Sequence, residues 1–211
     1  MGAEIRAVVF DFGGVLITPI TRLLDEISEW HGVSMEDMLD VLMGPRNTST
    51  PDHPWHRAER GEIPIAVFQD EIQPYAEAAG LRLRGDEYER LLCGEFDVHQ
   101  RVVARIEALR AEGYRTALLT NSFKEFRDHL EAHVDFGIFD VVVDSSEVGC
   151  RKPEPEIYEL TTRLVGARPE EILYLDDFAA NLDGAVAEGW KSIHVTDEAS
   201  ALRALDAALA P

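Results

Sequence analysis

The chain has 211 residues, of which 45% are hydrophobic and 28% are charged, proportions typical of a globular protein with one sizeable core or a core with a modest insertion. Its 20 Lys and Arg residues stand against 40 Asp and Glu residues, and the formal net charge of -20 argues against nucleic acid or an anionic membrane surface as a partner. The sequence shows no secretion signal and no apolar run long enough to cross a bilayer, so we expect a cytoplasmic protein.

The first predicted element is a buried strand that delivers Asp11 to its carboxyl end. Residues 7–10 form a short apolar run of β-branched and aromatic character, and the pair Gly13-Gly14 ends it. Ligands of open α/β sheets bind at the carboxyl ends of the strands, so a carboxylate at this place is well situated for chemistry. The alternative is that Asp11 only begins a turn, and the rest of the chain decides between the two.

Residues 20–96 predict a block of helices without a convincing strand. Ser34 is a predicted N-cap, and Pro74 is predicted to bend or end the helix that contains it. The block is predicted to contain helices at 20–30, 34–43, 63–79 and 86–96 and a loop at 44–55.

From Val98 onward, predicted strands and helices alternate. Strands are predicted at 114–120, 139–144, 172–176 and 192–195, and helices at 101–112, 123–132, 154–164, 179–188 and 198–209. This alternation predicts a parallel sheet with helices on both faces, which the first strand also joins. The fold class is therefore α/β, with a Rossmann-like core at 1–17 and 97–211 and an all-helical cap inserted at 18–96.

Acidic side chains follow two of the predicted strands. Asp11 follows the first strand, Asp176 ends the strand at 172–176, and Asp177 follows it. Taken alone, Asp177 has a simpler role as the N-cap of the next helix. Taken together, three carboxylates at one sheet edge repel one another unless a cation neutralises them, and a hard all-oxygen cluster suits Mg²⁺.

Groups that suit a phosphate come from the same edge. The Thr120 hydroxyl, the Asn121 amide, the Lys152 ammonium and the backbone N–H groups of the glycine turn would hold a phosphate dianion. The simpler alternatives are that Thr120 caps a helix and that Lys152, beside a proline, is solvated. Asp11 would then attack phosphorus as a nucleophile and form an aspartyl-phosphate that water cleaves.

In this order, the segments resemble the four motifs of the haloacid dehalogenase-like hydrolase superfamily. The segments are VVFDFGGVL around Asp11, ALLTNS around Thr120, RKPEPEIY around Lys152 and YLDDFAANLDGA around Asp176 and Asp177. The position of the helical block resembles the cap of the subgroup that includes glucose-1-phosphatase-like enzymes and the N-terminal phosphatase domain of epoxide hydrolase. The resemblance spans residues 5–195.

This resemblance implies a role for each matching residue. It implies that Asp11 is the nucleophile and a Mg²⁺ ligand, and that Gly13 offers its backbone carbonyl to the metal. It implies that Thr120 and Asn121 contact phosphate, and that Lys152 neutralises both the nucleophile and the phosphate.

The fourth motif is expected to complete the metal site. The resemblance implies that Asp176 binds Mg²⁺ with Asp177 in support, and that Asn181 orients Lys152 or an acidic neighbour. One position departs from the family pattern: many of its phosphatases carry a second Asp, a general acid and base, where this chain has Gly13. Losing such a group typically costs on the order of 10²–10⁴ in rate.

A replacement acid could come from the cap. His53, His56, Arg57 and Arg60 cluster there, and the alternative is that these are surface residues. What replaces the missing acid stays open at this point.

The sequence thus predicts a Mg²⁺-dependent phosphatase of a small phosphorylated metabolite, acting as a monomer or homodimer, with the cap as a lid. The alternative enzyme is a metal-independent 2-haloacid dehalogenase, which uses the same Asp to displace halide. Against it, the pair Asp176-Asp177 crowds negative charge around a carboxylate substrate. A third possibility is a non-catalytic module that binds a phosphate ligand.

Overall fold

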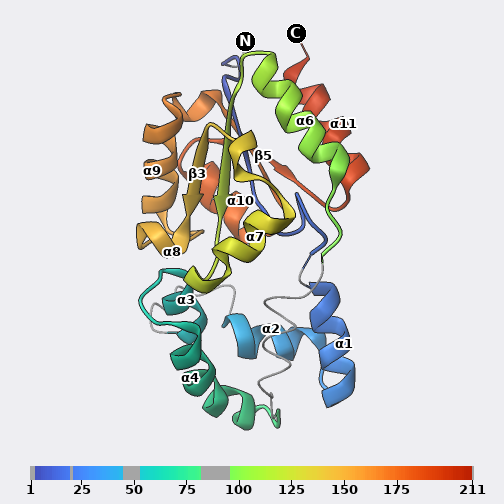
Figure 1. Cartoon of the computed structure of the whole chain (residues 1–211), viewed down its shortest axis with the longest axis vertical. Coiled ribbons are helices and arrows are strands. Elements are labelled where there is room, and N and C mark those ends of the chain that lie inside the picture. Colours follow the sequence, from blue (N-terminus) through green and yellow to red (C-terminus); the bar gives the residue numbers. More distant parts are fainter. Residues whose placement is uncertain (1–2, 20, 45–52, 82–95, 211) are drawn as a thin grey trace.

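A five-stranded parallel sheet forms the centre of the chain (Figure 1). The computed structural model describes residues 3–19, 21–44, 53–81 and 96–210. From one edge to the other, the strands are β3 (Val141–Asp144), β2 (Arg115–Thr120), β1 (Ala7–Phe10), β4 (Ile172–Asp176) and β5 (Lys191–His194). Because every neighbouring pair is parallel, all five strands end at the same edge of the sheet.

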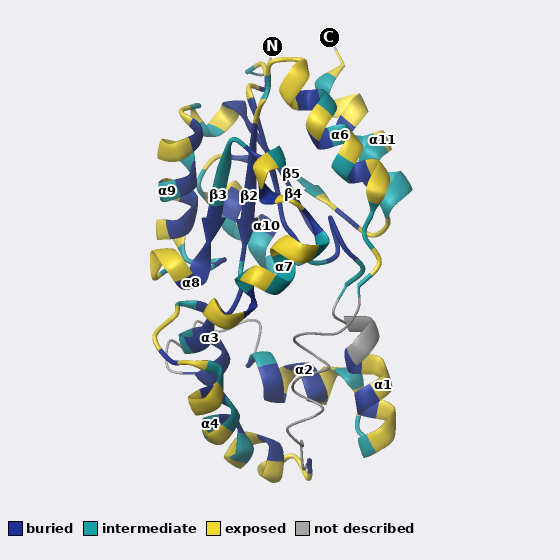
Figure 2. Cartoon of the chain, in the orientation of Figure 1, coloured by how far each residue is buried: buried dark blue, intermediate teal, exposed yellow. Residues whose placement is uncertain are grey.

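Helices cover both faces of this sheet, because alternate residues of each strand point to opposite sides. The covering helices are α6 (Gln100–Ala111), α9 (Pro155–Val165), α10 (Ala179–Ala187) and α11 (Glu198–Leu209). Val8 and Phe10 of β1 pack in one core with α6 and α11, whereas Ala7 and Val9 pack in another with α9 and α10. The strands β1 and β4 are buried throughout, and β2 is buried after its first residue, Arg115 (Figure 2). This arrangement confirms the predicted α/β fold class.

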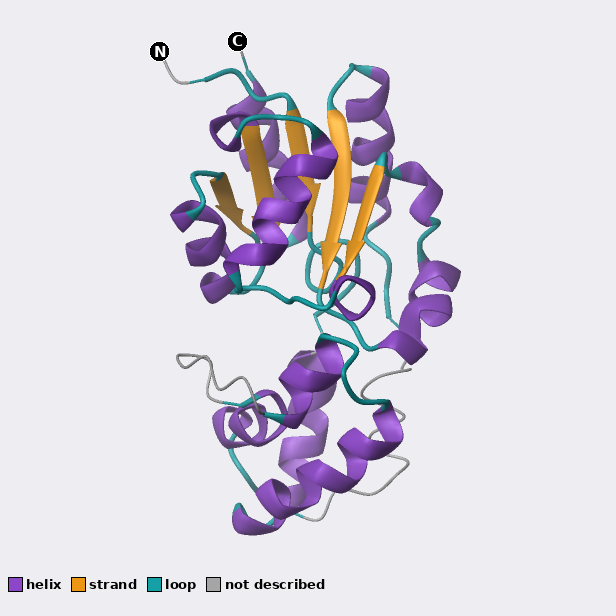
Figure 3. Cartoon of the chain, turned by 90° about the vertical axis from the view of Figure 1, so that its left-hand side faces the viewer, coloured by secondary structure: helices purple, strands orange, loops and turns teal. Residues whose placement is uncertain are grey.

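Among the described residues between β1 and β2, four helices gather beyond the carboxyl ends of the strands, and we call them the cap (Figures 1 and 3). They are α1 (Thr21–His31), α2 (Met35–Met43), α3 (Pro54–Glu59) and α4 (Ile65–Ala78). Ser34 caps α2 as predicted, because its side chain accepts a hydrogen bond from the backbone N–H of Asp37 at 3.1 Å. The apolar centre of the cap also contains Phe123 and Phe126, which follow β2, so the cap packs directly on the core.

One cap feature differs from the prediction, and a second is decided only in part, because α4 does not end at Pro74 while a bend there stays a prediction. The helix α3 begins at Pro54, inside the segment predicted as loop, with His53 as its N-cap and a proline at the first turn. The helix α4 continues through Pro74 and does not end there. Ile72 and Ala76, on either side of Pro74, are fully buried, and their burial offsets the roughly 3 kcal/mol cost of an interior proline. The helix predicted at 86–96 lies almost wholly outside the described residues.

Short elements complete the core. They are the 3-10 turns η1 (Lys124–Phe126), η2 (Phe136–Ile138) and η3 (Pro169–Glu171) and the helices α7 (Arg127–His133) and α8 (Ser145–Val148). The segment predicted as one helix at 123–132 is therefore a 3-10 turn followed by α7. Over the described ranges, no helix has both the length and the apolar character that crossing a bilayer requires.

Candidate active site

Three carboxylates converge where β1 and β4 end. Asp11 directly follows β1, and its backbone N–H donates to the carbonyl of Leu175 at 2.9 Å, which ties the two strand ends together. Asp176 is the last residue of β4, and Asp177 follows it. One carboxylate oxygen from each of the three lies within 4.8 Å of the others. The structure therefore brings together the acidic residues that the sequence placed at one edge.

The Lys152 ammonium lies between two of these carboxylates. Its Nζ donates to Asp11 Oδ1 at 2.6 Å, to Asp176 Oδ2 at 2.9 Å and to the Leu119 carbonyl at 3.0 Å, which uses all three of its protons. Only 1% of the residue is exposed, so the alternative of a solvated lysine is wrong. Burial lowers the pKa of Lys152, but the two carboxylates raise it by more, and the side chain stays charged.

The Asn121 side chain holds the backbone of Lys152. Its Oδ1 accepts from the Lys152 N–H at 2.9 Å, and its Nδ2 donates to the Lys152 carbonyl at 3.0 Å. This pair of bonds makes Asn121 a positioning residue for the lysine. Direct contact of Asn121 with phosphate stays a prediction. Thr120, the last residue of β2, is buried and lines the cavity above Asp11.

Asp176 is already satisfied by protein donors. Its Oδ1 accepts from the Phe178 N–H at 2.7 Å, and its Oδ2 accepts from Lys152 and from the Tyr174 hydroxyl. The Asn181 amide reaches both oxygens, at 3.2 and 3.0 Å, and thus contacts the acidic neighbour. A carboxylate with this many donors has little free capacity for a further ligand.

Asp177 is in the opposite situation. Its Oδ1 is buried and has no hydrogen-bond partner among the described residues. A Cβ built on Gly14 would collide with the Asp177 carboxylate, and Gly14 also has a positive φ of 69°. Glycine is thus required at position 14 for the close approach of Asp177. In contrast, a Cβ on Gly13 would meet nothing within 4 Å, so the space beside Gly13 is open.

The cluster carries more negative than positive charge, and the pKa values respond to it. Burial, together with the nearby charge of Asp176, raises the pKa of Asp11 to about 7 against the lowering effect of Lys152. Burial and the charges of Asp11 and Asp176 raise the pKa of Asp177 to about 8. A divalent cation would relieve both shifts, and oxygen donors with one unpartnered buried carboxylate oxygen fit Mg²⁺.

A cavity of about 180 Å³ lies above Asp11, between the core and the cap. Its polar side includes Asp11, Lys152, Asp177, Thr120 and Asn121. Its other side is apolar and is lined by Phe12, Ile17, Met43, Trp55, Phe96, Phe123, Phe126, Leu130 and Phe178. The cavity therefore has one charged side, at the carboxyl ends of the strands, and one apolar and largely aromatic side.

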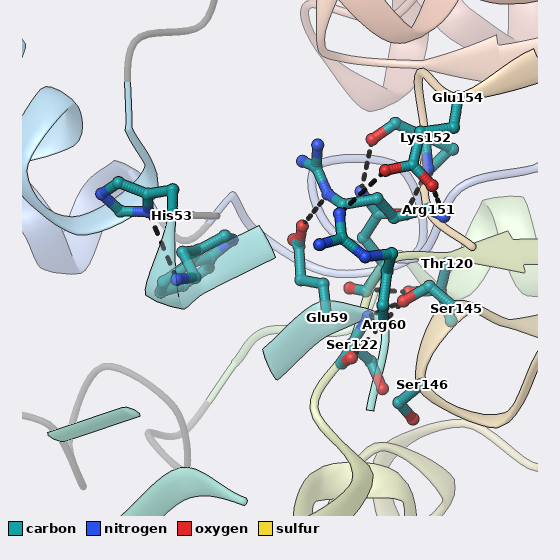
Figure 4. A network of polar contacts seen from close by, with 12 residues as sticks. His53, Glu59, Arg60, Thr120, Ser122, Ser145, Ser146, Arg151, Lys152 and Glu154 are labelled. Carbon is teal, nitrogen blue, oxygen red and sulfur yellow. Dashed lines mark hydrogen bonds and ion pairs between the residues drawn. The ribbon is translucent and has the colours of Figure 1, made fainter. Parts of the chain in front are cut away.

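Ion pairs connect α3 of the cap with the loop that carries Lys152 (Figure 4). Glu59, whose side chain is 5% exposed, is paired with Arg151, and both line the cavity. Arg60 donates from Nη1 to Glu154 at 2.9 Å. No sequence pattern pointed to Glu59, and the only signal for Arg151 was that it adjoins Lys152.

The cap residues considered as replacement acids do not reach the site. None of His53, His56, Arg57 and Arg60 lines the cavity. The expectation of surface exposure is wrong for His53 and His56, which are 3% and 6% exposed. His53 caps α3 by accepting from the Trp55 N–H at 3.2 Å, and burial lowers its pKa to about 4, so its ring is neutral at pH 7. Arg57 pairs with Glu71 at 2.6 Å.

Comparison with known families identifies similar proteins. A model described as "Hydrolase: haloacid dehalogenase-like hydrolase" matches residues 5–189. Acyl-CoA dehydrogenase family member 10 from Mus musculus is 32% identical over 212 residues, which cover 99% of this chain. This chain spans only 19% of the length of that mouse relative.

Relatives of similar length have two different activities in their names. Sesquiterpene phosphatase astK from Aspergillus oryzae is 26% identical over 200 residues, 93% of each chain. (S)-2-haloacid dehalogenase 1 from Pseudomonas sp. is 28% identical over 196 residues, 90% of this chain and 84% of the dehalogenase. The relatives therefore include both enzyme classes considered above.

A solved structure shares the fold. The magnesium complex of a HAD family enzyme from Bacteroides thetaiotaomicron has a TM-score of 0.68 to this chain at 22% identity. The match covers 95% of this chain and 99% of the other. This likeness supports the assignment of a Rossmann-like α/β fold.

Proposed function

The chain belongs to the haloacid dehalogenase-like hydrolases and is a hydrolase, and we propose that it is a Mg²⁺-dependent phosphatase of a small phosphorylated molecule. The observation that carries this proposal is the charge of the buried site. Three carboxylates each place one oxygen within 4.8 Å of the others, and one ammonium pairs with only two of them. In this proposal residues 1–17 and 97–211 are the catalytic core, and residues 18–96 are a lid that selects the substrate and excludes water.

We propose that Asp11, Asp177 and the Gly13 backbone carbonyl hold the metal. The buried, unpartnered Oδ1 of Asp177 supports this assignment, whereas the donors around Asp176 favour a role in orienting Lys152. This division is the reverse of the one that the resemblance implied. When bound, Mg²⁺ would supply positive charge that offsets the carboxylates and the phosphate oxygens.

In the proposed reaction, an Asp11 carboxylate oxygen forms a bond to phosphorus while the bond between phosphorus and the ester oxygen breaks. Lys152 neutralises charge on Asp11 and on the phosphate, and Thr120 donates to a phosphate oxygen. Gly13 offers no acid, so the leaving oxygen takes its proton from water. A second water then attacks the aspartyl-phosphate, which releases inorganic phosphate and restores Asp11.

Chelation of divalent metal tests the proposal. With p-nitrophenyl phosphate, we expect hydrolysis in Mg²⁺ and a fall in kcat/KM of at least about 10² in excess EDTA, because the carboxylates would then repel the phosphate. Hydrolysis that survives chelation would contradict the metal requirement.

The same assay separates the alternatives. Chloride release from 2-chloropropionate without added metal would instead indicate a dehalogenase, which the relative from Pseudomonas sp. makes the second candidate. The unpartnered Oδ1 of Asp177 beside a carboxylate substrate argues against that activity. Binding of phosphate esters without turnover would indicate a binding module.

The matched variants Asp177→Asn and Asp176→Asn should separate metal binding from folding. We expect Asp177→Asn to weaken Mg²⁺ binding at least about 10-fold, because it removes a ligand charge. We expect Asp176→Asn mainly to lower the free energy of unfolding, by about 1–3 kcal/mol, because Lys152 loses one of its two carboxylate partners. Calorimetric titration with Mg²⁺ and urea unfolding in EDTA measure the two effects.

The pH dependence of stability provides a further check on Asp177. Its pKa is raised from 3.8 to about 8 in the folded protein, so between these pH values the folded state holds a proton that the unfolded state has lost. This group therefore destabilises the metal-free protein progressively as the pH rises from about 4 to 8. The stability gained by Asp177→Asn in EDTA should grow over this range, and a constant difference would contradict the assignment.

A further inference from the structure

The side of the cavity opposite the carboxylates is apolar. It is formed by Trp55 and Met43 of the cap, by Phe123 and Phe126 after β2, and by Ile17 and Phe96 at the junctions with the cap. The Trp55 and Phe123 rings pack edge to face with centroids 4.9 Å apart, and both residues are buried. The volume of about 180 Å³ compares with the roughly 150 Å³ apolar cavity that holds one benzene ring.

Most polar side chains that border this space already have partners, and the exceptions among the described residues are Trp55 Nε1 and Asp177 Oδ1, which are buried without one. Asn121 bonds to the backbone of Lys152, Ser122 donates to the Asp144 carboxylate at 3.0 Å, and Asn181 donates to Asp176.

Glu59 and Arg151, two charged residues that also line the cavity, are paired with each other (Figure 4). Trp55 Nε1 can donate to one oxygen, but a leaving group with several hydroxyls would place the others against apolar side chains, where they lose hydrogen bonds to water. Each unmet hydroxyl would weaken binding by a factor of roughly 5 or more.

We propose that this site takes phosphate monoesters of apolar alcohols, of the size of a short alkyl chain or a single ring, and discriminates against sugar and polyol phosphates. The part of this inference that concerns the phosphate group rests on the proposed function, and the part that concerns the alcohol group rests on the apolar cavity wall. Burial of each added CH₂ group against this wall should tighten binding about 4-fold until the cavity is filled.

Binding of a matched set of esters tests this inference. Methyl, propyl and pentyl phosphate and glycerol 3-phosphate are titrated calorimetrically into the full chain carrying Asp11→Asn, with Mg²⁺ present. Propyl and glycerol phosphate share a three-carbon skeleton and differ by two hydroxyls. We expect Kd to fall along the alkyl series and propyl phosphate to bind at least about 10-fold more tightly than glycerol 3-phosphate.

Two methionine variants test whether the preference for longer alkyl esters arises in the cavity. Met43 and Met35 are both half-buried in the apolar centre of the cap, but Met43 lines the cavity and Met35 does not. Met43→Gln, introduced beside Asp11→Asn, should weaken pentyl phosphate about 5-fold more than methyl phosphate. Met35→Gln in the same background should not change the ratio between the two esters.

The outcomes distinguish this inference from the proposed function. The inference is overturned if glycerol 3-phosphate binds as tightly as propyl phosphate or more tightly, or if Met43→Gln and Met35→Gln have the same effect. In that case, hydrolysis of p-nitrophenyl phosphate by the wild-type protein would still support the proposed phosphatase activity. Absence of both binding and hydrolysis of every ester would overturn both. A preference for alkyl esters without turnover would support the apolar site and contradict the phosphatase.

Discussion

Asp11→Asn should lower kcat for p-nitrophenyl phosphate by at least about 10⁴, because an amide cannot replace the carboxylate that attacks phosphorus. The substitution keeps the shape of the side chain and an oxygen that can accept from Lys152 Nζ, now 2.6 Å from Asp11 Oδ1. The loss should therefore lie in kcat and not in folding. Acid-quenched wild-type protein should also carry phosphate on residue 11, detectable by mass spectrometry, and the variant should carry none.

The control for this experiment is Asp183→Asn. Asp183 is exposed on α10, the helix that follows Asp176 and Asp177, and lies outside the residues that line the cavity. We expect its kcat to stay within about 2-fold of wild type. Substantial turnover by Asp11→Asn, or phosphate on a residue other than 11, would remove Asp11 from its proposed role.

Lys152→Met should be the most destabilising single change at the site. It removes the cation that pairs with Asp11 at 2.6 Å and with Asp176 at 2.9 Å, where all three residues are at least 90% buried. Breaking a buried ion pair from one side typically costs about 3–5 kcal/mol, because the remaining charge keeps its desolvation cost without its partner. Urea unfolding in EDTA at pH 7.5 measures the loss.

Lys124→Met is the matched control, because Lys124 is exposed on η1 and lies outside the cavity lining. We expect it to change the free energy of unfolding by less than about 0.5 kcal/mol. If Lys152→Met unfolds at the same urea concentration as wild type and the control, the ammonium does not hold the two carboxylates together. Turnover should fall with Lys152→Met in either case, because charge on the phosphate loses its neutralising partner.

Much of the core was predictable because its signals are local. The apolar run of β1 and the alternation after Val98 predicted the parallel sheet, and parallel strands necessarily bring Asp11, Thr120 and Asp176 to one edge. Each of these three strands ends at the predicted residue. Such patterns depend on the spacing of apolar residues along the sequence, and they can be recognised without knowing which segments pack together.

The cap was less predictable, for a physical reason. The helix α3 has only six residues, too few for a helical period to show, and it forms because His53 and Pro54 begin it and Trp55 packs against Phe68 and Phe123. The burial of His53 likewise depends on the ring of Tyr75, at a centroid distance of 5.1 Å. Contacts between distant segments decided both features.

The sequence by itself determined the sheet, the family and the edge at which Asp11, Lys152 and the Asp176-Asp177 pair would meet, because strand ends and motif order are properties of the linear chain. Only the tertiary structure decided that donors surround Asp176 whereas one oxygen of Asp177 has no hydrogen-bond partner among the described residues. It also decided that Glu59 and Arg151 form an ion pair at the cavity. Adjacent aspartates are identical in sequence, and they become different only when Lys152, Tyr174 and Asn181 pack around one of them.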